Sequence, residues 1–463
     1  MTVLPCPLAP GSITLHGNGM EGYIVSLIIF TAILAVFGLG LNLQWGFTGL
    51  INFGHVAFMT LGAYTTALLS SIDIPWLPLP LQIFGAVILG ATLAATLGLL
   101  IGFSTLRLRE DYLAIVTIGV SEIVRLIALN EEWLTRGSFG IQRYPLPLGQ
   151  FSPNLPTRLG MIAILLLVIG IAYSHLWRWM GQQLQPISRS QLVTSLVPIV
   201  GYLVSLSILI VGIGLGARSL KAAANLPSWV LGLGLLSAIV GTSLLYTWLA
   251  KRFLMPLAAR TTALSLVWVS ILSLLGGWLT TIAAIALYHY DRSPTKNGLM
   301  WIAVLLVALI YQALQALVRS PWGRILKAIR EDEFVARALG KNVFWYKLQA
   351  FMLGGFIAGL AGALYAWQLT VVYPDNFQPL LTFNAWTIVV LGGAGNNLGT
   401  ILGAAIFWAY QSVTRFILSD IIPLDDARLG AFRVMMIGLL LMVLMVWRPQ
   451  GILGNKEELT LGR

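Results

Sequence analysis

Long apolar runs alternate with short polar segments along most of the chain. A helix needs about 20 mostly apolar residues to cross the hydrocarbon core of a bilayer. The runs lack the alternation of barrel strands, so the pattern predicts membrane-spanning α-helices. We expect an all-α, polytopic transmembrane helical bundle with about 11 spans plus a glycine-rich re-entrant element. The candidate spans are 22–42, 54–70, 81–103, 112–129, 158–177, 192–216, 227–250, 262–289, 299–318, 347–369 and 431–447.

The re-entrant element is predicted within the apolar stretch 384–412, which contains the sequence LGGAGNNLGT at 391–400. A segment that dips into the membrane and returns keeps the basic C-terminal tail in the cytoplasm, as the positive-inside rule favours. Irregular backbone at membrane depth is tolerated where it is buried in protein or lines a wet cavity. Gly392, Gly393 and Gly395 are therefore candidates for a translocation path, and close packing of small residues between helices is the alternative interpretation.

Basic residues lie in the short segments between the apolar runs and are densest at 319–347. Cytoplasmic loops of membrane proteins carry an excess of Lys and Arg, so this segment is expected to face the cytoplasm. The predicted organisation is an N-terminal tail (1–21), an N-terminal transmembrane part (22–177), additional transmembrane helices (178–298), a C-terminal part with the basic segment (299–455) and a C-terminal tail (456–463).

Composition agrees with a membrane protein and excludes several other classes. The chain is 58% hydrophobic and only 10% charged, whereas soluble domains carry about 25% charged residues. The net charge of +11 is placed between the spans and does not indicate nucleic-acid binding. A single cysteine, Cys6, and four scattered histidines predict neither a disulfide framework nor a metal site. The first residues lack Lys and Arg before the first apolar run and do not resemble a cleaved signal peptide.

Sequence motifs of common enzymes are missing from the chain. It contains no G-x-x-x-x-G-K-[ST] phosphate loop, no G-x-S-x-G elbow and no H-E-x-x-H pair. The glycine-rich GAGNNLGT has no lysine and lies inside an apolar stretch. We therefore expect that the chain is not an enzyme and does not hydrolyse ATP alone.

The basic segment carries the pattern of an amphipathic helix. Ser320-Pro321 is a typical helix start. Apolar residues recur at helical intervals among mixed charges up to Gly340, which is a typical helix stop. The segment therefore predicts a short amphipathic helix over 322–339 at the membrane face, suited to docking a partner; a solvated loop is the alternative. The apolar positions are Ile325, Ile329, Val335 and Leu339.

Polar residues near or within the apolar runs are weaker candidates for the translocation path. These residues are Asn42, Gln44, Asn52, His55, Glu122, Asn384 and Trp386. The three residues between 42 and 52 have an alternative task, which is to satisfy the backbone of a broken helix. His55 begins an apolar run and is more typical of a hydrogen-bonded structural residue. Glu122 shares a helix face with Arg125, so a mutually neutralising pair is the alternative to a functional ionisable group.

Four ordered segments resemble bacterial ABC-type permeases for branched-chain and other neutral amino acids. They are GLNLQWGFTGLINFGHVAFMTLGAYTTALL (40–69), LRLREDYLAIVTIGVSEIVRLI (106–127), SPWGRILKAIREDEFVARALGKNVFWYKLQAFMLGGFIAGLAGALYA (from 320) and VVLGGAGNNLGTILGAAI (389–406). The resemblance covers 40–145 and 299–455, and 178–298 has no recognised counterpart. Gly340 follows Glu333 by seven residues, whereas the broader ABC-permease motif has a spacing of six.

The resemblance implies that 319–347 is the coupling segment, which docks on an ATP-binding subunit. Its implied coupling residues are Arg324, Lys327, Arg330, Glu331, Glu333, Arg337 and Gly340. The implied partners are a second homologous permease, two ATP-binding subunits that hold ATP and Mg, a periplasmic solute-binding protein, the lipid bilayer of the bacterial inner membrane and a small-molecule substrate. No cofactor, metal or nucleic acid is expected in this chain.

The implied substrates are neutral or branched-chain amino acids. Urea or a short amide is the alternative within the same family. An ion-coupled secondary transporter is an alternative from another class, and such a transporter would need paired acidic residues in the membrane. A structural or assembly membrane protein is a further alternative. Only Glu122 has the character that ion coupling requires, and Arg125 lies close to it in the sequence.

Overall fold

The computed structural model describes residues 17–72, 75–106, 110–149, 151–183, 276–277, 279–421, 430, 435, 437–438 and 451–453. Contacts divide the chain into two units, one of Met1–Leu165 with Ile282–Arg463 and one of Leu166–Thr281. The predicted spans at 192–216 and 227–250, and most of those at 262–289 and 431–447, lie outside the described residues. The predicted boundaries at 178 and 298 and the number of spans therefore stay predictions.

Helices make up nearly all of the described structure, which confirms the predicted all-α class. The long helices are α1 (Gly17–Leu41), α2 (Val56–Ser71), α3 (Leu79–Thr105), α4 (Glu110–Asn130), α6 (Leu155–Gln183), α11 (Pro294–Arg319), α14 (Val343–Leu369), α15 (Leu380–Gly392) and α16 (Asn397–Ile421). The short ones are η1 (Asn42–Gly46), α5 (Glu132–Thr135), η2 (Gly137–Phe139), η4 (Tyr290–Arg292), α12 (Pro321–Glu331), α13 (Glu333–Ala338) and η5 (Pro374–Phe377).

Five of the described helical segments are long and apolar enough to cross a membrane. They are Glu21–Gly46, Leu79–Thr105, Tyr112–Asn130, Pro294–Arg319 and Val343–Leu369. A sixth crossing arises if α15 and α16 together form one broken span. Several helices of this length and composition indicate a multi-pass membrane protein.

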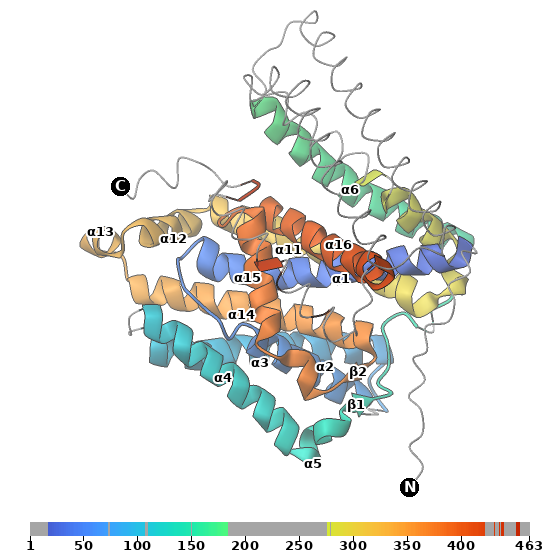
Figure 1. Cartoon of the computed structure of the whole chain (residues 1–463), viewed down its shortest axis with the longest axis horizontal. Helices are drawn as coiled ribbons and strands as arrows, with labels where there is room; N and C mark the ends of the chain where they lie inside the picture. The colour runs from blue at the N-terminus through green and yellow to red at the C-terminus, as the bar shows by residue number, and fades with distance from the viewer. Residues whose placement is uncertain are drawn as a thin grey trace, which may run out of the picture. The chain divides into compact units, whose positions relative to one another are not determined.

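The core of the larger unit forms around α14, which packs against α1, α2 and α3 (Figure 1). Small residues allow the backbones to meet closely. A Cβ atom added at Gly62 of α2 would lie 2.1 Å from the carbonyl oxygen of Gly359 in α14. Close approach of small residues is a principal source of helix packing in membranes, where the lipid is as apolar as the side chains.

The glycine-rich element bends the chain sharply. The chain bends by 118° between the segments Pro374–Gly392 and Asn397–Arg415, and α15 runs across the neighbouring helices in Figure 1. Gly393 and Gly395 adopt φ values of 109° and 80° in the turn, which is backbone that glycine adopts at low cost. A Cβ at Gly392 would meet the Gly399 carbonyl oxygen at 2.1 Å, so close packing is the role that the structure shows for Gly392.

The predicted helix over 322–339 is wrong in one respect, because the structure contains two helices there, α12 and α13. Asp332 separates them with an extended backbone, φ −154° and ψ 108°. Its carboxylate accepts hydrogen bonds from the backbone nitrogens of Phe334 and Val335. Asp332 is thus an N-cap that begins a new helix. Gly340, with φ 74°, follows the end of α13 as predicted.

The only strands among the described residues, β1 (Ile141–Gln142) and β2 (Val371–Val372), pair antiparallel. They attach the loop after α4 to the segment between α14 and α15. This pairing lies at the end of α14 opposite to α12 and α13.

Candidate functional site

The second helix of the predicted coupling segment, α13, and the residue after it present apolar side chains outward. Phe334, Val335 and Leu339 have exposed fractions of 80%, 55% and 72%. Four of the predicted coupling residues, Arg324, Glu331, Arg337 and Gly340, are also exposed. Exposed apolar residues rimmed by charge are typical of a protein interaction surface.

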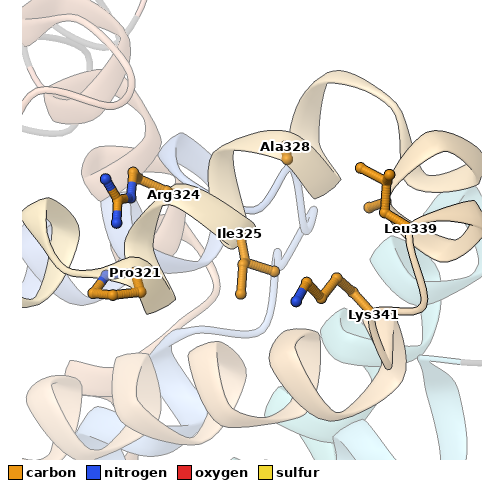
Figure 2. Close-up of a pocket in the computed structure, with 7 residues that line it drawn as sticks. Pro321, Arg324, Ile325, Ala328, Leu339 and Lys341 are labelled. Carbon is orange, nitrogen blue, oxygen red and sulfur yellow. The ribbon is translucent and has the colours of Figure 1, made fainter.

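A groove of about 290 Å³ is lined by residues of α12, α13 and the turn after α13. Figure 2 shows Ile325 and Lys341 facing each other across this groove, with Arg324 nearer the start of α12. Its remaining lining residues are Pro321, Ala328, Ala336 and Leu339. An apolar groove with cationic groups at its margin suits an apolar segment that carries acidic residues.

The other predicted coupling residues point toward the bundle. Arg330 donates a hydrogen bond to the carbonyl oxygen of Gly46, and the Lys327 ammonium lies 5.9 Å from the centroid of the Phe47 ring. Leu326 and Ile329 are buried beside them. Lys327 and Arg330 therefore hold α12 on the end of η1, a role that sequence reasoning missed because periodicity does not identify a neighbour.

Glu333 ties α13 to α14. Its carboxylate accepts hydrogen bonds from Lys347 and Arg337, both at 2.6 Å. Partial burial raises the pKa of Glu333, but the hydrogen bonds and charges of Lys347 and Arg337 outweigh this effect and hold the pKa below its ordinary value of 4.5. The ionised carboxylate thus favours the folded coupling segment at neutral pH.

Replacing Glu333 with Gln is expected to lower the free energy of unfolding by about 1 kcal/mol at pH 7, the upper end for a partly exposed ion pair. A lowered pKa in the folded state makes this contribution present above pH 4.5 and lost as the pH falls from there through the lowered pKa. Thermal unfolding of both proteins at pH 7 and at lower pH measures the difference. Glu331→Gln is the matched control, and a difference that grows toward acid contradicts the prediction.

Asn42 joins distant parts of the chain within the bundle. Its side chain is fully buried. Its Nδ2 donates to Oδ1 of Asn397 at 3.0 Å, and its Oδ1 accepts from the backbone nitrogen of Gly395 at 2.9 Å. Nδ2 of Asn397 also donates to Oε1 of Gln315 in α11 at 3.4 Å. Sequence reasoning missed Asn397 and Gln315, although each is a polar residue in an apolar run.

Asn52 belongs to a second buried chain of amides. It donates to Oε1 of Gln44 at 2.8 Å, and Gln44 donates to the carbonyl oxygen of Phe351 at 2.8 Å. The Asn52 carbonyl oxygen accepts from the Trp386 indole at 3.0 Å. These contacts are those expected of groups that satisfy a broken helix. A place on the translocation path stays a prediction for Asn42 and Asn52.

His55 is fully buried at the start of α2. Its Nε2 lies 3.2 Å from the carbonyl oxygen of Phe37, and its ring packs against the rings of Phe37 and Phe58. This environment is that of a hydrogen-bonded core histidine. Asn384, by contrast, is half-buried on α15.

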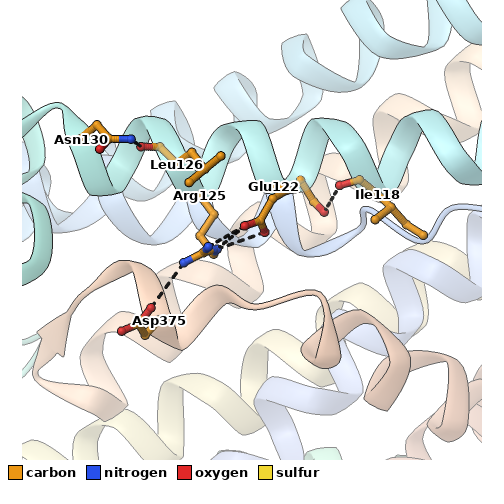
Figure 3. A network of polar contacts seen from close by, with 7 residues as sticks. Ile118, Glu122, Arg125, Leu126, Asn130 and Asp375 are labelled. Atoms are coloured by element: carbon orange, nitrogen blue, oxygen red, sulfur yellow. Dashed lines mark hydrogen bonds and ion pairs between the residues drawn. The ribbon is translucent and has the colours of Figure 1, made fainter.

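Glu122 lies in an ion-pair network between α4 and η5 (Figure 3). Arg125 contacts Glu122 at 2.5 Å and Asp375 at 3.4 Å. The predicted neutralising pair is therefore present, and it extends to a third charge that the sequence did not indicate. The network lies toward the end of α14 opposite to the coupling segment, so Glu122 and Asn42 do not form one site. Among the described residues, no group of three or more His, Cys, Asp or Glu is placed to hold a metal ion.

Comparison with known proteins gives a consistent family. Residues 23–180 and 194–445 match the model of the family described as branched-chain amino acid transport system / permease component. The match includes much of 178–298, where the motifs alone indicate no counterpart. No solved structure matches the chain.

Similar proteins carry related descriptions. The high-affinity branched-chain amino acid transport system permease protein LivM of Escherichia coli is 28% identical over 429 residues, which is 93% of this chain and 69% of that protein. LivM of Salmonella typhimurium is 27% identical over 429 residues, again 93% of this chain and 69% of that protein. BraD of Pseudomonas aeruginosa, described as a permease protein of the same kind of system, is 32% identical over 139 residues, 30% of this chain and 42% of that protein. The chain therefore belongs to the family of branched-chain amino acid transport system permease components.

Proposed function

We propose that this chain is the transmembrane permease subunit of an ATP-driven ABC importer for neutral or branched-chain amino acids. Membership of the permease family over most of the chain supports the transport role. The observation that carries the coupling role is the polar helix pair α12–α13, inserted between the apolar helices α11 and α14 with its groove exposed. Such a helix pair presents a docking surface directly connected to α11 and to the core helix α14.

The proposal assigns ATP hydrolysis to other subunits. The chain has no phosphate loop, so two ATP-binding subunits would hold ATP and Mg. A second homologous permease would complete the path, and a periplasmic solute-binding protein would deliver the substrate to the bacterial inner membrane. No cofactor is assigned to this chain.

The coupling segment would transmit movement as a rigid lever. Glu333 fastens α13 to α14, and Arg330 fastens α12 to η1. A partner that binds the groove differently in two states would shift the balance between outward-open and inward-open arrangements, because only a differential interaction shifts an equilibrium. A urea or short-amide permease would use the same lever. Ion coupling is the weaker alternative, since Glu122 already faces Arg125 at 2.5 Å.

Competition of uptake tests the proposal. In a strain that lacks this chain, plasmid-borne expression is expected to restore accumulation of radiolabelled leucine. Excess unlabelled leucine or alanine should reduce the label at least about tenfold if they share the site, whereas urea should leave it unchanged. Inactivating the ATP-binding subunits is expected to abolish accumulation. Full uptake without those subunits, or competition by urea alone, contradicts the proposal.

A further inference from the structure

We infer that Asn42 is a positioning residue that transmits movement of α12 to the hairpin formed by α15 and α16. The basis is a juxtaposition: η1 contacts α12 at one end and, through Asn42, the turn of the hairpin at the other. The inference rests on the proposed function, because a partner must move α12. Neither the family nor the relatives' names assign such a role to this residue.

The first link joins α12 to the end of η1. Arg330 donates to the Gly46 carbonyl oxygen, and Lys327 lies over the Phe47 ring. A Cβ at Gly49 would lie 3.7 Å from Cγ of Arg330, so the chain after η1 follows the surface of α12 closely. A displacement of α12 therefore acts on the backbone between Gly46 and Gly49.

The second link joins η1 to the hairpin turn. Asn42 uses both ends of its amide, donating to Asn397 and accepting from the backbone of Gly395. Gly46 closes against the same turn, because a Cβ there would lie 2.1 Å from Oδ1 of Asn42 and 2.5 Å from the nitrogen of Gly395. With no solvent to replace these bonds, the turn must follow η1 or lose buried hydrogen bonds, which is unfavourable.

The third link joins the hairpin turn to the end of α15 through residues 451–453. Asn396 donates to the carbonyl oxygen of Leu453 at 2.7 Å, and the nitrogens of Ile452 and Leu453 donate to Leu391 and Gly392, both at 3.0 Å. Residues 451–453 thus fasten the turn to the end of α15. A displacement of Gly395 by η1 therefore moves α15 and α16 together.

The helix type at 42–46 suits a transmitting element. The bond from the Phe47 nitrogen to the Asn42 carbonyl oxygen, at 3.1 Å, closes a π-turn at the end of α1. Short π-segments hold one residue more than an α-turn and often mark functional sites. Asn397 also contacts Gln315, and α11 leads directly into α12. The hairpin turn is therefore linked to both ends of α12.

The test uses the complete transporter in proteoliposomes, with its ATP-binding subunits and solute-binding protein, and measures leucine imported per ATP hydrolysed. Asn42→Ala is expected to lower this ratio about tenfold, within the usual range of coupling between sites. Asn42→Ser, which is too short to keep both bonds, should show the same loss and serves if the alanine variant is poorly folded. The matched control is Asn297→Ala, which removes another buried amide, bonded to Ala286 at 3.0 Å, and should leave the ratio unchanged.

A double variant separates transmission from local damage. If Arg330 and Asn42 act in series, Arg330→Gln with Asn42→Ala lowers the ratio no further than the worse single variant. Additive losses, or a normal ratio in both Asn42 variants, would overturn the inference while leaving the importer intact. Failure of the proposed function is a different result, because the unmodified transporter would then import leucine without its ATP-binding subunits.

Discussion

Replacing both Arg324 and Lys341 with Glu is expected to lower uptake at least about 100-fold, while the protein remains folded in the membrane. Both residues are exposed and line the groove between α12 and α13. The groove suits a partner segment that carries acidic residues, so the two variant carboxylates would face like charges. Such a pairing at an interface costs several kcal/mol, and about 3 kcal/mol corresponds to a 100-fold loss of affinity. The measurement is leucine uptake together with co-purification of the ATP-binding subunits.

The reversal at Lys296 is the matched control. Lys296 is exposed in the first turn of α11, at the opposite end of that helix from α12. Lys296→Glu should leave co-purification of the ATP-binding subunits unchanged. Each single reversal in the groove should give an intermediate loss. Normal uptake by the double variant would show that the groove is not the docking surface.

The long-range pattern of hydropathy was enough to predict the fold class. Helices α1, α3, α4, α11 and α14 occupy the predicted runs because continuous apolar sequence in lipid requires a helix. The sharp bend at the glycine-rich element also followed from the sequence, since Gly393 and Gly395 supply the positive φ values of the turn. These features depend on local composition, which a single sequence contains.

Contacts between distant residues were not predictable in the same way. Asn42 and Asn397 are 355 residues apart, and no local pattern indicates that an amide in one glycine-rich segment bonds to another. The coupling residues were identified by the resemblance of the whole segment to a family, which does not say which side of the helix each residue occupies. Their division into outward residues such as Arg324 and inward residues such as Arg330 depends on the position of η1. The break at Asp332 was not predicted, although Asp is a residue type that favours helix N-caps.

Replacing Gly62 with Val is expected to have the largest effect on stability. Helices α2, α3 and α14 cross at Gly62, Gly90 and Gly359. A Cβ at Gly62 would lie 2.1 Å from the Gly359 carbonyl oxygen, and one at Gly90 would lie 3.0 Å from that of Gly62. The obstacles are backbone atoms, which no rotamer change removes. Overpacking of this kind costs about 3 kcal/mol or more, because α2 and α14 must separate.

The measurement is thermal unfolding of purified protein in detergent, where Gly62→Val should lower Tm by at least about 5 °C and reduce the yield of folded protein. Gly85→Val is the matched control, because a Cβ at Gly85 of α3 meets no atom within 4 Å. Both substitutions place a β-branched residue in an apolar helix, so helix propensity changes equally in the two variants. Only the contact between α2 and α14 distinguishes them. Equal Tm values for the two variants would therefore show that α2 and α14 do not meet at Gly62, and the packing around α14 would have to be different.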